Sequence, residues 1–259
     1  MSTVAPVQHT SPGLDATAVN WSTAWLERDL LPDWLVRVGI RRLLAARLRE
    51  ESTGGVEAQQ ERLRALIADL KRSPIALATA SANDQHYEVP SRFFELVLGK
   101  YLKYSSGLWD ADCHALDDAE RAMLSLTVLR AQIGDGHNIL ELGCGWGSLT
   151  LFMAERFPNS RITVVSNSSS QREFIQRKLQ QRNLTNVTVV TADINVFQPQ
   201  ERFDRIVSVE MFEHMRNHEL LLSRIASWMR PEALLFVHIF THRTFAYPFE
   251  ARDASDWMA

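Results

Sequence analysis

Cysteine is scarce in this sequence. Only Cys113 and Cys144 occur among its 259 residues. Two thiols cannot form the disulfide framework on which small secreted proteins depend, so we expect a protein of the reducing cytoplasm. The N-terminus also lacks a basic stretch followed by an apolar one, which argues against a secretory signal peptide.

Charge of one sign and long apolar runs are scarce as well. The 28 basic and 31 acidic residues leave a net charge of −3, which gives no electrostatic reason to expect a nucleic acid as partner. The apolar run at residues 234–240 is interrupted by His238. It is far shorter than the roughly 20 residues of a transmembrane helix, so no transmembrane segment is expected.

The N-terminal half favours helices. Residues 1–20 are rich in Ser, Thr, Ala and Pro without periodicity, which predicts a disordered tail. Within residues 21–75, apolar residues at i, i+3, i+4 and i+7 between positions 57 and 70 indicate an amphipathic helix, and we expect a small helical subdomain. Residues 76–132 should form a linker and further helices. In the last of these, at 117–132, Asp117 and Glu120 match a capping box.

Residues 133–259 alternate between strands and helices. Apolar segments predict strands at 138–142, 161–166, 187–191, 203–209 and 233–240. Helices are expected at 148–156, 171–182 and 217–229. This alternation is typical of an α/β fold of the Rossmann-like type, with a parallel sheet covered on both faces.

A glycine-rich turn follows the first of these strands. Gly143, Gly145 and Gly147 allow the backbone to turn sharply and to approach a ligand closely. The next helix offers free N–H groups and a partial positive charge at its N-terminus. Such a turn would suit the pyrophosphate of a dinucleotide or the methionine and sugar of S-adenosylmethionine, and an ordinary tight turn is a third alternative.

The spacing of the glycines separates these alternatives. Dinucleotide-binding turns follow the pattern G-x-G-x-x-G, and this turn is one residue shorter, with Glu141 ahead of it. The pattern Glu-x-Gly-x-Gly-x-Gly resembles the first motif of class I methyltransferases. In that motif a carboxylate such as Glu141 meets the cofactor's ammonium group, directly or through water.

Two further strand ends carry candidate cofactor-binding residues. An acid commonly binds the ribose after the second strand, but here Ser166 and Asn167 stand there, with Gln171 nearby. Hydroxyl and amide groups can also bond a ribose diol. After the third strand, Asp193 could accept from an adenine amino group while Ile194 packs on the ring, although an acid of a surface turn is the alternative.

Two carboxylates and an imidazole follow the fourth strand. Glu210, Glu213 and His214 should face the ligand crevice, because the carboxyl ends of parallel strands line it. Such a cluster suits proton removal. A helix-capping carboxylate with a solvated histidine would be the simpler interpretation. No Cys/His pair has the spacing of zinc ligands, so no metal is expected. His238 and His242 suit structural hydrogen bonds at least as well as catalysis.

Four segments together resemble one known family. They are Lys-Tyr-Ser-Ser-Gly-Leu-Trp at 103–109, Gly-Cys-Gly-Trp-Gly at 143–147, Asn-Ser-Ser-Ser-Gln at 167–171 and Phe-Glu-His at 212–214. From about residue 21 onward, the chain resembles the cyclopropane-fatty-acid synthase and coclaurine N-methyltransferase superfamily of class I S-adenosylmethionine-dependent methyltransferases. The resemblance implies this cofactor, and it adds Tyr104 and Ser105 to the residues expected to touch it.

Two positions separate the branches of this superfamily. Lipid cyclopropane synthases carry a cysteine that helps to hold a bicarbonate base where this chain has Ser106, and usually a small residue in place of Glu210. Amine N-methyltransferases are similar to this chain at both positions. In that branch the residues matching Glu213 and His214 form the base pair, with Glu210 assisting. The resemblance therefore implies methyl transfer to a small-molecule amine. Lipid modification and a non-catalytic, cofactor-binding remnant are the alternatives.

The resemblance also implies that one edge of the predicted sheet is uncovered. Members of the superfamily continue well beyond the last matching residues, where they add two strands and much of the substrate wall. We therefore expect the fifth strand to be an uncovered edge, which a second copy or another partner could cover.

Overall fold

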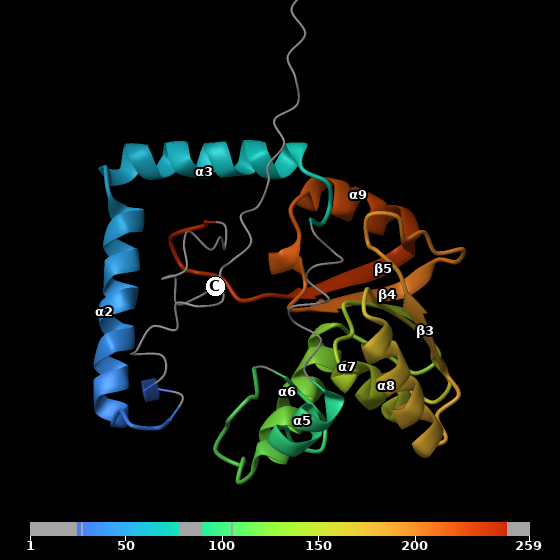
Figure 1. Ribbon diagram of the computed structural model, residues 1–259. Coiled ribbons are helices and arrows are strands. Elements are labelled where there is room, and N and C mark those ends of the chain that lie inside the picture. The colour runs from blue at the N-terminus through green and yellow to red at the C-terminus, as the bar shows by residue number, and fades with distance from the viewer. Residues whose placement is uncertain (1–24, 27, 78–89, 105, 248–259) are drawn as a thin grey trace, which may run out of the picture. The chain divides into compact units, whose positions relative to one another are not determined.

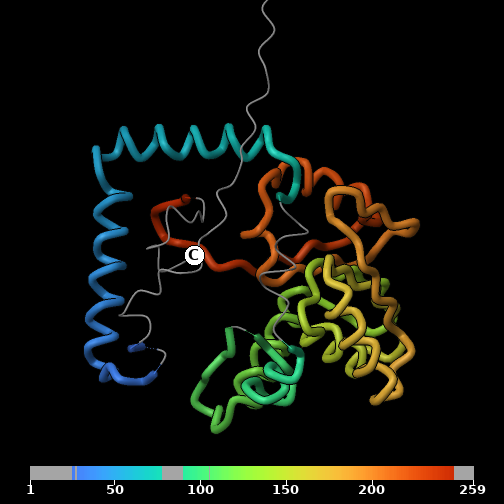
Figure 2. The backbone as a smooth tube through the Cα atoms, viewed as in Figure 1, coloured from blue at the N-terminus to red at the C-terminus, as the bar shows by residue number. Residues whose placement is uncertain are grey.

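The computed structural model describes residues 25–26, 28–77, 90–104 and 106–247. The chain divides into two compact units, one of residues 1–66 with 242–259 and a larger one of residues 67–241. Figures 1 and 2 follow the chain from blue to red. The predicted tail at 1–20 and most of the predicted linker after Ala76 lie outside the described residues.

The smaller unit contains two long helices. Helix α2 spans Asp33–Ser52, and α3 spans Gly55–Arg72, whose last turns belong to the larger unit (Figure 1). The predicted helix at 57–70 lies within α3. The Arg62 guanidinium of α3 donates to the carbonyl oxygens of Glu51 and Thr53, at 2.6 and 3.0 Å. This side chain satisfies carbonyl groups that the end of α2 leaves without helical partners.

The larger unit is built on a parallel sheet of five strands in the order β3-β2-β1-β4-β5. The strands are β1 Asn138–Leu142, β2 Arg161–Ser166, β3 Val187–Thr191, β4 Phe203–Val209 and β5 Met229–His238. The first four have the predicted bounds. The fifth begins earlier, because residues 229–232 continue directly from the preceding helix into the strand.

Helices cover both faces of this sheet (Figure 1). On one face lie α6 Leu116–Arg130, α7 Ser148–Arg156 and α8 Ser169–Gln181, whose apolar side chains share a core with Ile139 of β1. On the other face, α9 His218–Trp228 packs with Leu140 and Leu142. Successive residues of β1 thus point to opposite cores, as the pleat of a strand requires. The predicted α/β fold is confirmed.

The order of the strands locates the ligand crevice. The chain moves outward from β1 to β2 and β3, then returns to place β4 on the other side of β1. At such a reversal the loops after the two central strands diverge and leave a crevice at their carboxyl ends. The glycine turn follows β1 and Glu210 follows β4, so both border this crevice.

The capping box predicted at Asp117 and Glu120 is wrong. Helix α6 begins at Leu116 with Ala115 as N-cap, and Asp118 accepts from the Ala115 N–H. The fully buried Glu120 carboxylate instead accepts three backbone N–H bonds from residues outside the helix, namely Gly99, Tyr101 and Lys103. A local sequence pattern cannot distinguish a cap from a long-range contact, because both need the same acidic side chain near a helix start.

Two asparagines anchor residues 71–76 to the rest of the larger unit. The Asn195 amide exchanges two hydrogen bonds with the backbone of Ala76, at 3.1 and 3.0 Å. The Asn217 side chain caps α9 through Leu220 and also donates to the carbonyl oxygens of Lys71 and Ser73. These contacts hold residues 71–76 against the loops after β3 and β4.

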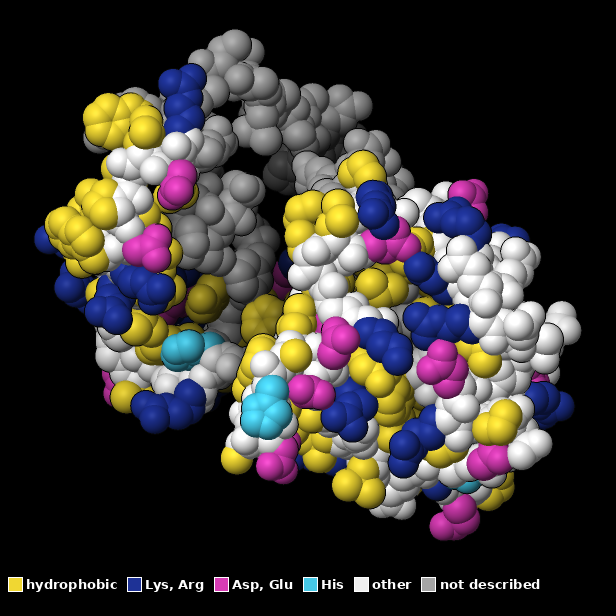
Figure 3. All heavy atoms as spheres, turned by 90° about the horizontal axis from the view of Figure 1, so that it is seen from below, with side chains coloured by type: hydrophobic (Ala, Val, Ile, Leu, Met, Phe, Trp, Pro, Cys, Tyr) yellow, Lys and Arg dark blue, Asp and Glu magenta, His cyan; other side chains and the backbone are white. Residues whose placement is uncertain are grey.

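On the face of the larger unit that Figure 3 shows, basic and acidic side chains lie interspersed.

We expect Glu120→Ala to lower the free energy of unfolding by about 3 kcal/mol, because three backbone N–H groups lose their acceptor. Asp117→Ala is the matched control. It removes one exposed acceptor, for the Lys100 N–H, and should cost about 1 kcal/mol or less. Urea denaturation followed by circular dichroism measures both. Equal costs would show that Glu120 has no special role in holding residues 99–103.

Candidate functional site

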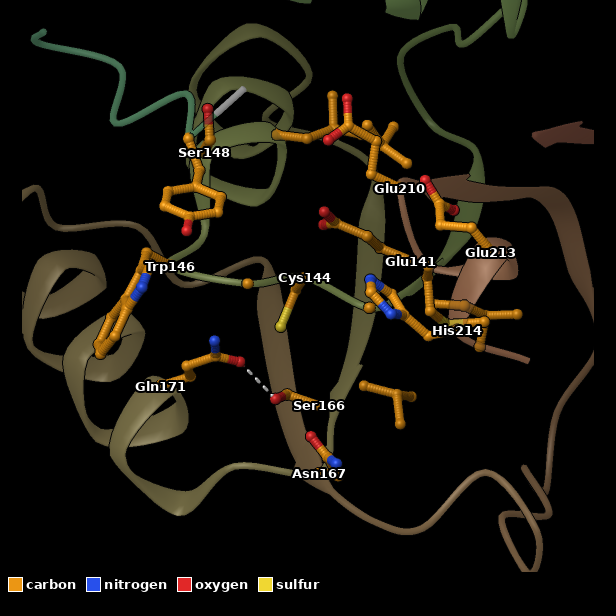
Figure 4. A pocket seen from close by; sticks show the side chains of 18 of the residues that line it. Glu141, Cys144, Trp146, Ser148, Ser166, Asn167, Gln171, Glu210, Glu213 and His214 are labelled. Carbon is orange, nitrogen blue, oxygen red and sulfur yellow. Dashed lines mark hydrogen bonds between the residues drawn. The ribbon is translucent and has the colours of Figure 1, made fainter. Parts of the chain in front are cut away.

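A cavity of about 620 Å³ lies at the carboxyl ends of β1 and β4. Its volume suits a small molecule. Its walls include the glycine turn, the ends of β2 and β4, and the segments before α6. Figure 4 shows the side chains that line it; the labelled ones are Glu141, Cys144, Trp146, Ser148, Ser166, Asn167, Gln171, Glu210, Glu213 and His214. The cavity therefore brings together the candidate cofactor residues and the candidate catalytic residues.

Two glycines of the turn serve different purposes. Both Gly145 and Gly147 have positive φ angles, of 49° and 82°. A Cβ atom on Gly147 would lie 2.7 Å from Cγ1 of Ile175, so this glycine allows α7 and α8 to pack closely. A Cβ atom on Gly145 would meet nothing within 4 Å. Gly145 lines the cavity, so its missing side chain leaves room there.

Glu141 is a buried acid in the floor of the cavity. Only 3% of its surface is exposed, and the Thr150 hydroxyl donates to its carboxylate at 2.6 Å. Burial raises the pKa of Glu141 to about 7, against the partial opposing effect of the Thr150 hydrogen bond. The carboxyl group can therefore gain or lose a proton near neutral pH, and a cation in the cavity would favour its charged form.

A network of short polar side chains forms the wall after β2. The Ser166 hydroxyl donates to the Gln171 side-chain oxygen at 2.7 Å, and the Ser168 hydroxyl caps α8. This bond fixes the Gln171 amide, whose nitrogen is turned away from Ser166 (Figure 4). Gln171 is only 2% exposed, and this nitrogen is buried without a hydrogen-bond partner. A buried donor of this kind is costly unless a ligand bonds it. Asn167 lines the same wall.

Sequence reasoning assigned no role to two polar residues of the cavity. Ser148 is the first residue of α7, and its hydroxyl is buried without a hydrogen-bond partner. Its position directly after the glycine turn could have identified it, because the start of a helix is where an anionic group binds. Lys103 belongs to one of the recognised motifs. It is 9% exposed and lines the cavity, where burial lowers its pKa against attraction to Glu210 and Glu120.

The three candidate catalytic residues all line the cavity. Glu210 follows β4 directly, and Glu213 and His214 lie in the short 3-10 helix Phe212–His214. Both oxygens of the Glu213 carboxylate are buried without a hydrogen-bond partner. Glu210 differs, because it accepts a hydrogen bond from the Ser106 hydroxyl at 2.6 Å. The structure thus places two carboxylates in distinct surroundings a few residues apart.

Other sequence-predicted residues lie differently. Ile194 lines the cavity, but Asp193 does not, and its carboxylate accepts from the Asn195 N–H at 2.7 Å. Tyr104 lines the cavity and is 71% exposed. Ser105 lies outside the described residues. Whether these residues bind a cofactor stays a prediction.

The two histidines of the C-terminal part do not line the cavity. The carbonyl oxygen of His238 accepts from the Glu210 N–H at 2.7 Å, and the His242 ring accepts from two nearby backbone N–H groups. His238 therefore contributes its backbone to the site.

Possible metal ligands and thiols were located in the described part of the chain. No group of three His, Cys, Asp or Glu side chains there is arranged to hold a metal ion. Both cysteines are free thiols. Burial raises the pKa of Cys144 well above its usual range, so this thiol of the glycine turn stays protonated. Nor does any helix in the described ranges have both the length and the apolar character to cross a membrane.

Comparison with known proteins places the chain in a family. Residues 77–259 match the family model of mycolic acid cyclopropane synthetase, which covers well over half of the chain. The chain belongs to this family. The resemblance inferred from the glycine turn and its neighbouring motifs is thereby confirmed.

Similar proteins include amine methyltransferases. The chain is 45% identical over 233 residues to (S)-coclaurine N-methyltransferase of Thalictrum flavum subsp. glaucum, covering 90% of this chain and 64% of that protein. A crystal structure of coclaurine N-methyltransferase bound to N-methylheliamine and SAH superimposes with a TM-score of 0.84 at 41% identity, over 92% of this chain and 68% of that one.

A lipid-modifying enzyme is more distant. Cyclopropane-fatty-acyl-phospholipid synthase of Escherichia coli (strain K12) is 30% identical over 156 residues, which are 60% of this chain and 39% of that protein. This chain thus spans about two thirds of the length of its amine-methylating relatives and much less of the lipid-modifying one.

The raised pKa of Glu141 predicts a pH-dependent stability. Below pH 4.5 the carboxyl group is protonated in both the folded and the unfolded chain, so Glu141 causes no penalty. Between pH 4.5 and about 7 the unfolded chain ionises first, and stability is lost as pH rises. Relative to Glu141→Gln, wild type should lose about 3 kcal/mol over this range. Urea unfolding at several pH values measures the difference. Parallel curves of stability against pH for wild type and Glu141→Gln would contradict the raised pKa of Glu141.

Proposed function

We propose that this protein transfers a methyl group from S-adenosylmethionine to the nitrogen of a small cyclic amine, such as coclaurine or a related alkaloid. The observation that carries the proposal is the Glu213 carboxylate, which is buried in the cavity wall with both oxygens lacking a partner. An unpartnered buried carboxylate favours a cationic or N–H-bearing ligand. The similarity to (S)-coclaurine N-methyltransferase supports the same class of acceptor.

The residues of the cavity fit this cofactor. When bound, S-adenosylmethionine would supply an electrophilic methyl group on its sulfonium. Gly143, Gly145 and Gly147 would hold its methionine and ribose part, with Glu141 facing the ammonium group. The unpartnered donors of Ser148 and Gln171 offer hydrogen bonds that a polar ligand can use. Tyr104, Ser105, Asn167, Asp193 and Ile194 complete the proposed cofactor-binding set.

The residues after β4 would prepare the acceptor. A cyclic amine is mostly protonated at neutral pH, and only the neutral amine has the lone pair that attacks a methyl group. We assign Glu213 and His214 to bind the ammonium group and remove its proton, with Glu210 assisting. His214 is exposed, so it can pass the proton to water. A positioned base of this kind typically contributes about 10²–10⁴-fold.

Positioning would supply the larger share of the rate. Holding two reactants in line is worth up to roughly 7–11 kcal/mol in effective concentration. Aromatic side chains can hold a cation by its attraction to the ring, which is worth about 0.5–2 kcal/mol. Tyr104 and Trp146 line the cavity and can act in this way. Phe212 is 5% exposed, packs in the core with α9 and does not line the cavity, so it is not available for this contact.

Two properties of the whole protein extend the proposal. The small number of cysteines, both of them free, supports a location in the reducing cytoplasm. Within the described residues, β5 pairs with β4 alone, so its other edge is open to a partner strand or a second copy. Light scattering across a range of concentrations tests whether the chain associates with itself.

The direct test combines calorimetry with a methyl-transfer assay. S-adenosylmethionine should bind one site per chain, and radiolabelled methyl groups should pass to a cyclic amine from a panel that includes coclaurine. Transfer to unsaturated phospholipids instead would support the lipid-modifying alternative. Binding without transfer to any acceptor would support a protein that only holds the cofactor, and the absence of binding would refute all three.

The glycine turn predicts a contrast between two variants. Gly145→Ala should cost about 1–2 kcal/mol in stability from its positive φ and should weaken S-adenosylhomocysteine binding at least tenfold, because its methyl group projects into the cavity. Gly147→Ala should cost roughly 3 kcal/mol or more, because the methyl group also collides with Ile175. Urea unfolding and calorimetry separate the two effects. Similar losses of affinity and stability in both variants would contradict the separate roles of Gly145 and Gly147.

The proposed base pair predicts a selective loss of turnover. The double variant Glu213→Gln, His214→Gln should lower kcat by about 10²-fold or more, because the amine stays protonated. Its affinity for S-adenosylhomocysteine should change less than threefold. The matched control is Glu219→Gln, an exposed acid on α9 that pairs with Lys71 and should leave kcat unchanged. If the double variant loses cofactor binding instead, Glu213 and His214 have a different role.

A further inference from the structure

One hydrogen bond joins two distant parts of the chain at the cavity. The Ser106 hydroxyl donates to the Glu210 carboxylate at 2.6 Å, between residues 104 positions apart. Ser106 follows residues 102–104, which line the cavity, and Glu210 follows β4 on the sheet side. The contact therefore connects a wall of the cavity to the sheet beneath it.

Both partners adopt an unfavourable backbone conformation. The φ angles of Ser106 and Glu210 are 58° and 52°, in the left-handed region that side chains disfavour. Such a conformation persists only where the surroundings impose it. The Glu210 N–H also donates to the His238 carbonyl oxygen of β5, at 2.7 Å, which fixes this backbone against the sheet. The backbone of Glu210 is thus fixed on the sheet side of the contact.

The wall segment has a second attachment at its other end. Residues 99–103 are held by the buried Glu120 carboxylate through three backbone N–H bonds. Attraction to both Glu210 and Glu120 opposes the effect of burial on the pKa of the Lys103 side chain. The 99–104 segment is therefore fastened by Glu120 through its backbone, and Ser106, two residues further on, is fastened by Glu210 through its side chain.

The three carboxylates of the cavity differ in what they contact. Glu141 accepts from Thr150, Glu210 accepts from Ser106, and only Glu213 has both oxygens buried without a hydrogen-bond partner. Figure 4 shows them on neighbouring parts of the wall. Glu210 thus has an oxygen committed to the Ser106 hydroxyl, whereas both oxygens of Glu213 remain for a ligand.

We propose that Glu210 is a positioning residue, which fastens the end of the 99–104 segment over the cavity through Ser106 and leaves Glu213 to meet the acceptor. This assignment rests on the proposed methyl transfer for the role of Glu213, and it states how Glu210 assists. The fastening of the segment is a property of the protein without ligand, so it can be tested apart from any activity.

Amide hydrogen exchange on the full chain without ligand tests the fastening. Ser106→Ala should speed exchange of residues 99–104 about tenfold, the effect of losing one hydrogen bond to a charged group, while β1 and β4 stay protected. Glu210→Gln keeps an oxygen for Ser106 and should have a smaller effect. Glu213→Gln is the matched control, because it removes a charge from the same cavity without touching the contact. Unchanged exchange in Ser106→Ala, or an equal increase in Glu213→Gln, would overturn the proposal.

Kinetics then separate positioning from proton transfer. Glu210→Gln should lower kcat by about tenfold or less and raise the KM for the amine, whereas Glu213→Gln should lose roughly 10²–10⁴-fold in kcat. Equal losses of kcat in the two Gln variants would show that Glu210 takes part in proton transfer. If even wild type transfers no methyl group, the proposed function fails, and the exchange data alone still decide whether the segment is fastened.

Discussion

The parallel pairing of β1 with β4 is the contact on which the site depends. Leu142, the last residue of β1, lies opposite Ser208 of β4, and the Ser208 hydroxyl donates to the Leu142 carbonyl oxygen at 3.0 Å. This register brings the glycine turn and the residues after β4 to the same edge of the sheet. Because the strand order reverses here, no helix crosses the gap between them, and a cavity remains. A shift of the register by one residue would turn the side chains near the strand ends to the opposite face.

Buried and half-buried polar side chains hold the irregular segments around this cavity. Glu120 bonds three backbone N–H groups of one wall, and Asn195 and Asn217 bond the backbone of another. The guanidinium of Arg224 donates to carbonyl oxygens of the loop after β3. Segments without helix or strand have no ladder of their own, so these side chains satisfy the backbone in its place. The shape of the cavity follows from their positions.

The resemblance implied that Ser106 and Glu210 distinguish this chain from lipid cyclopropane synthases, which were expected to carry a cysteine and usually a small residue there. These two residues are hydrogen-bonded to each other. A change at one position therefore alters the surroundings of the other, which gives a physical reason to consider the two differences as a pair. The unpartnered Glu213 is separate from this contact and remains available to an acceptor.

The sequence by itself determined the elements and the cofactor motif, since these depend on local properties. Short apolar segments predicted β1 to β4 with their observed bounds, and the spacing of Gly143, Gly145 and Gly147 indicated the ligand-binding turn. Only the tertiary structure decided what each acid contacts. Glu120 matched a capping pattern yet holds a distant segment, and the partner of Glu210 lies 104 residues away. Such contacts depend on which strands and loops are brought together, and no local pattern contains that information.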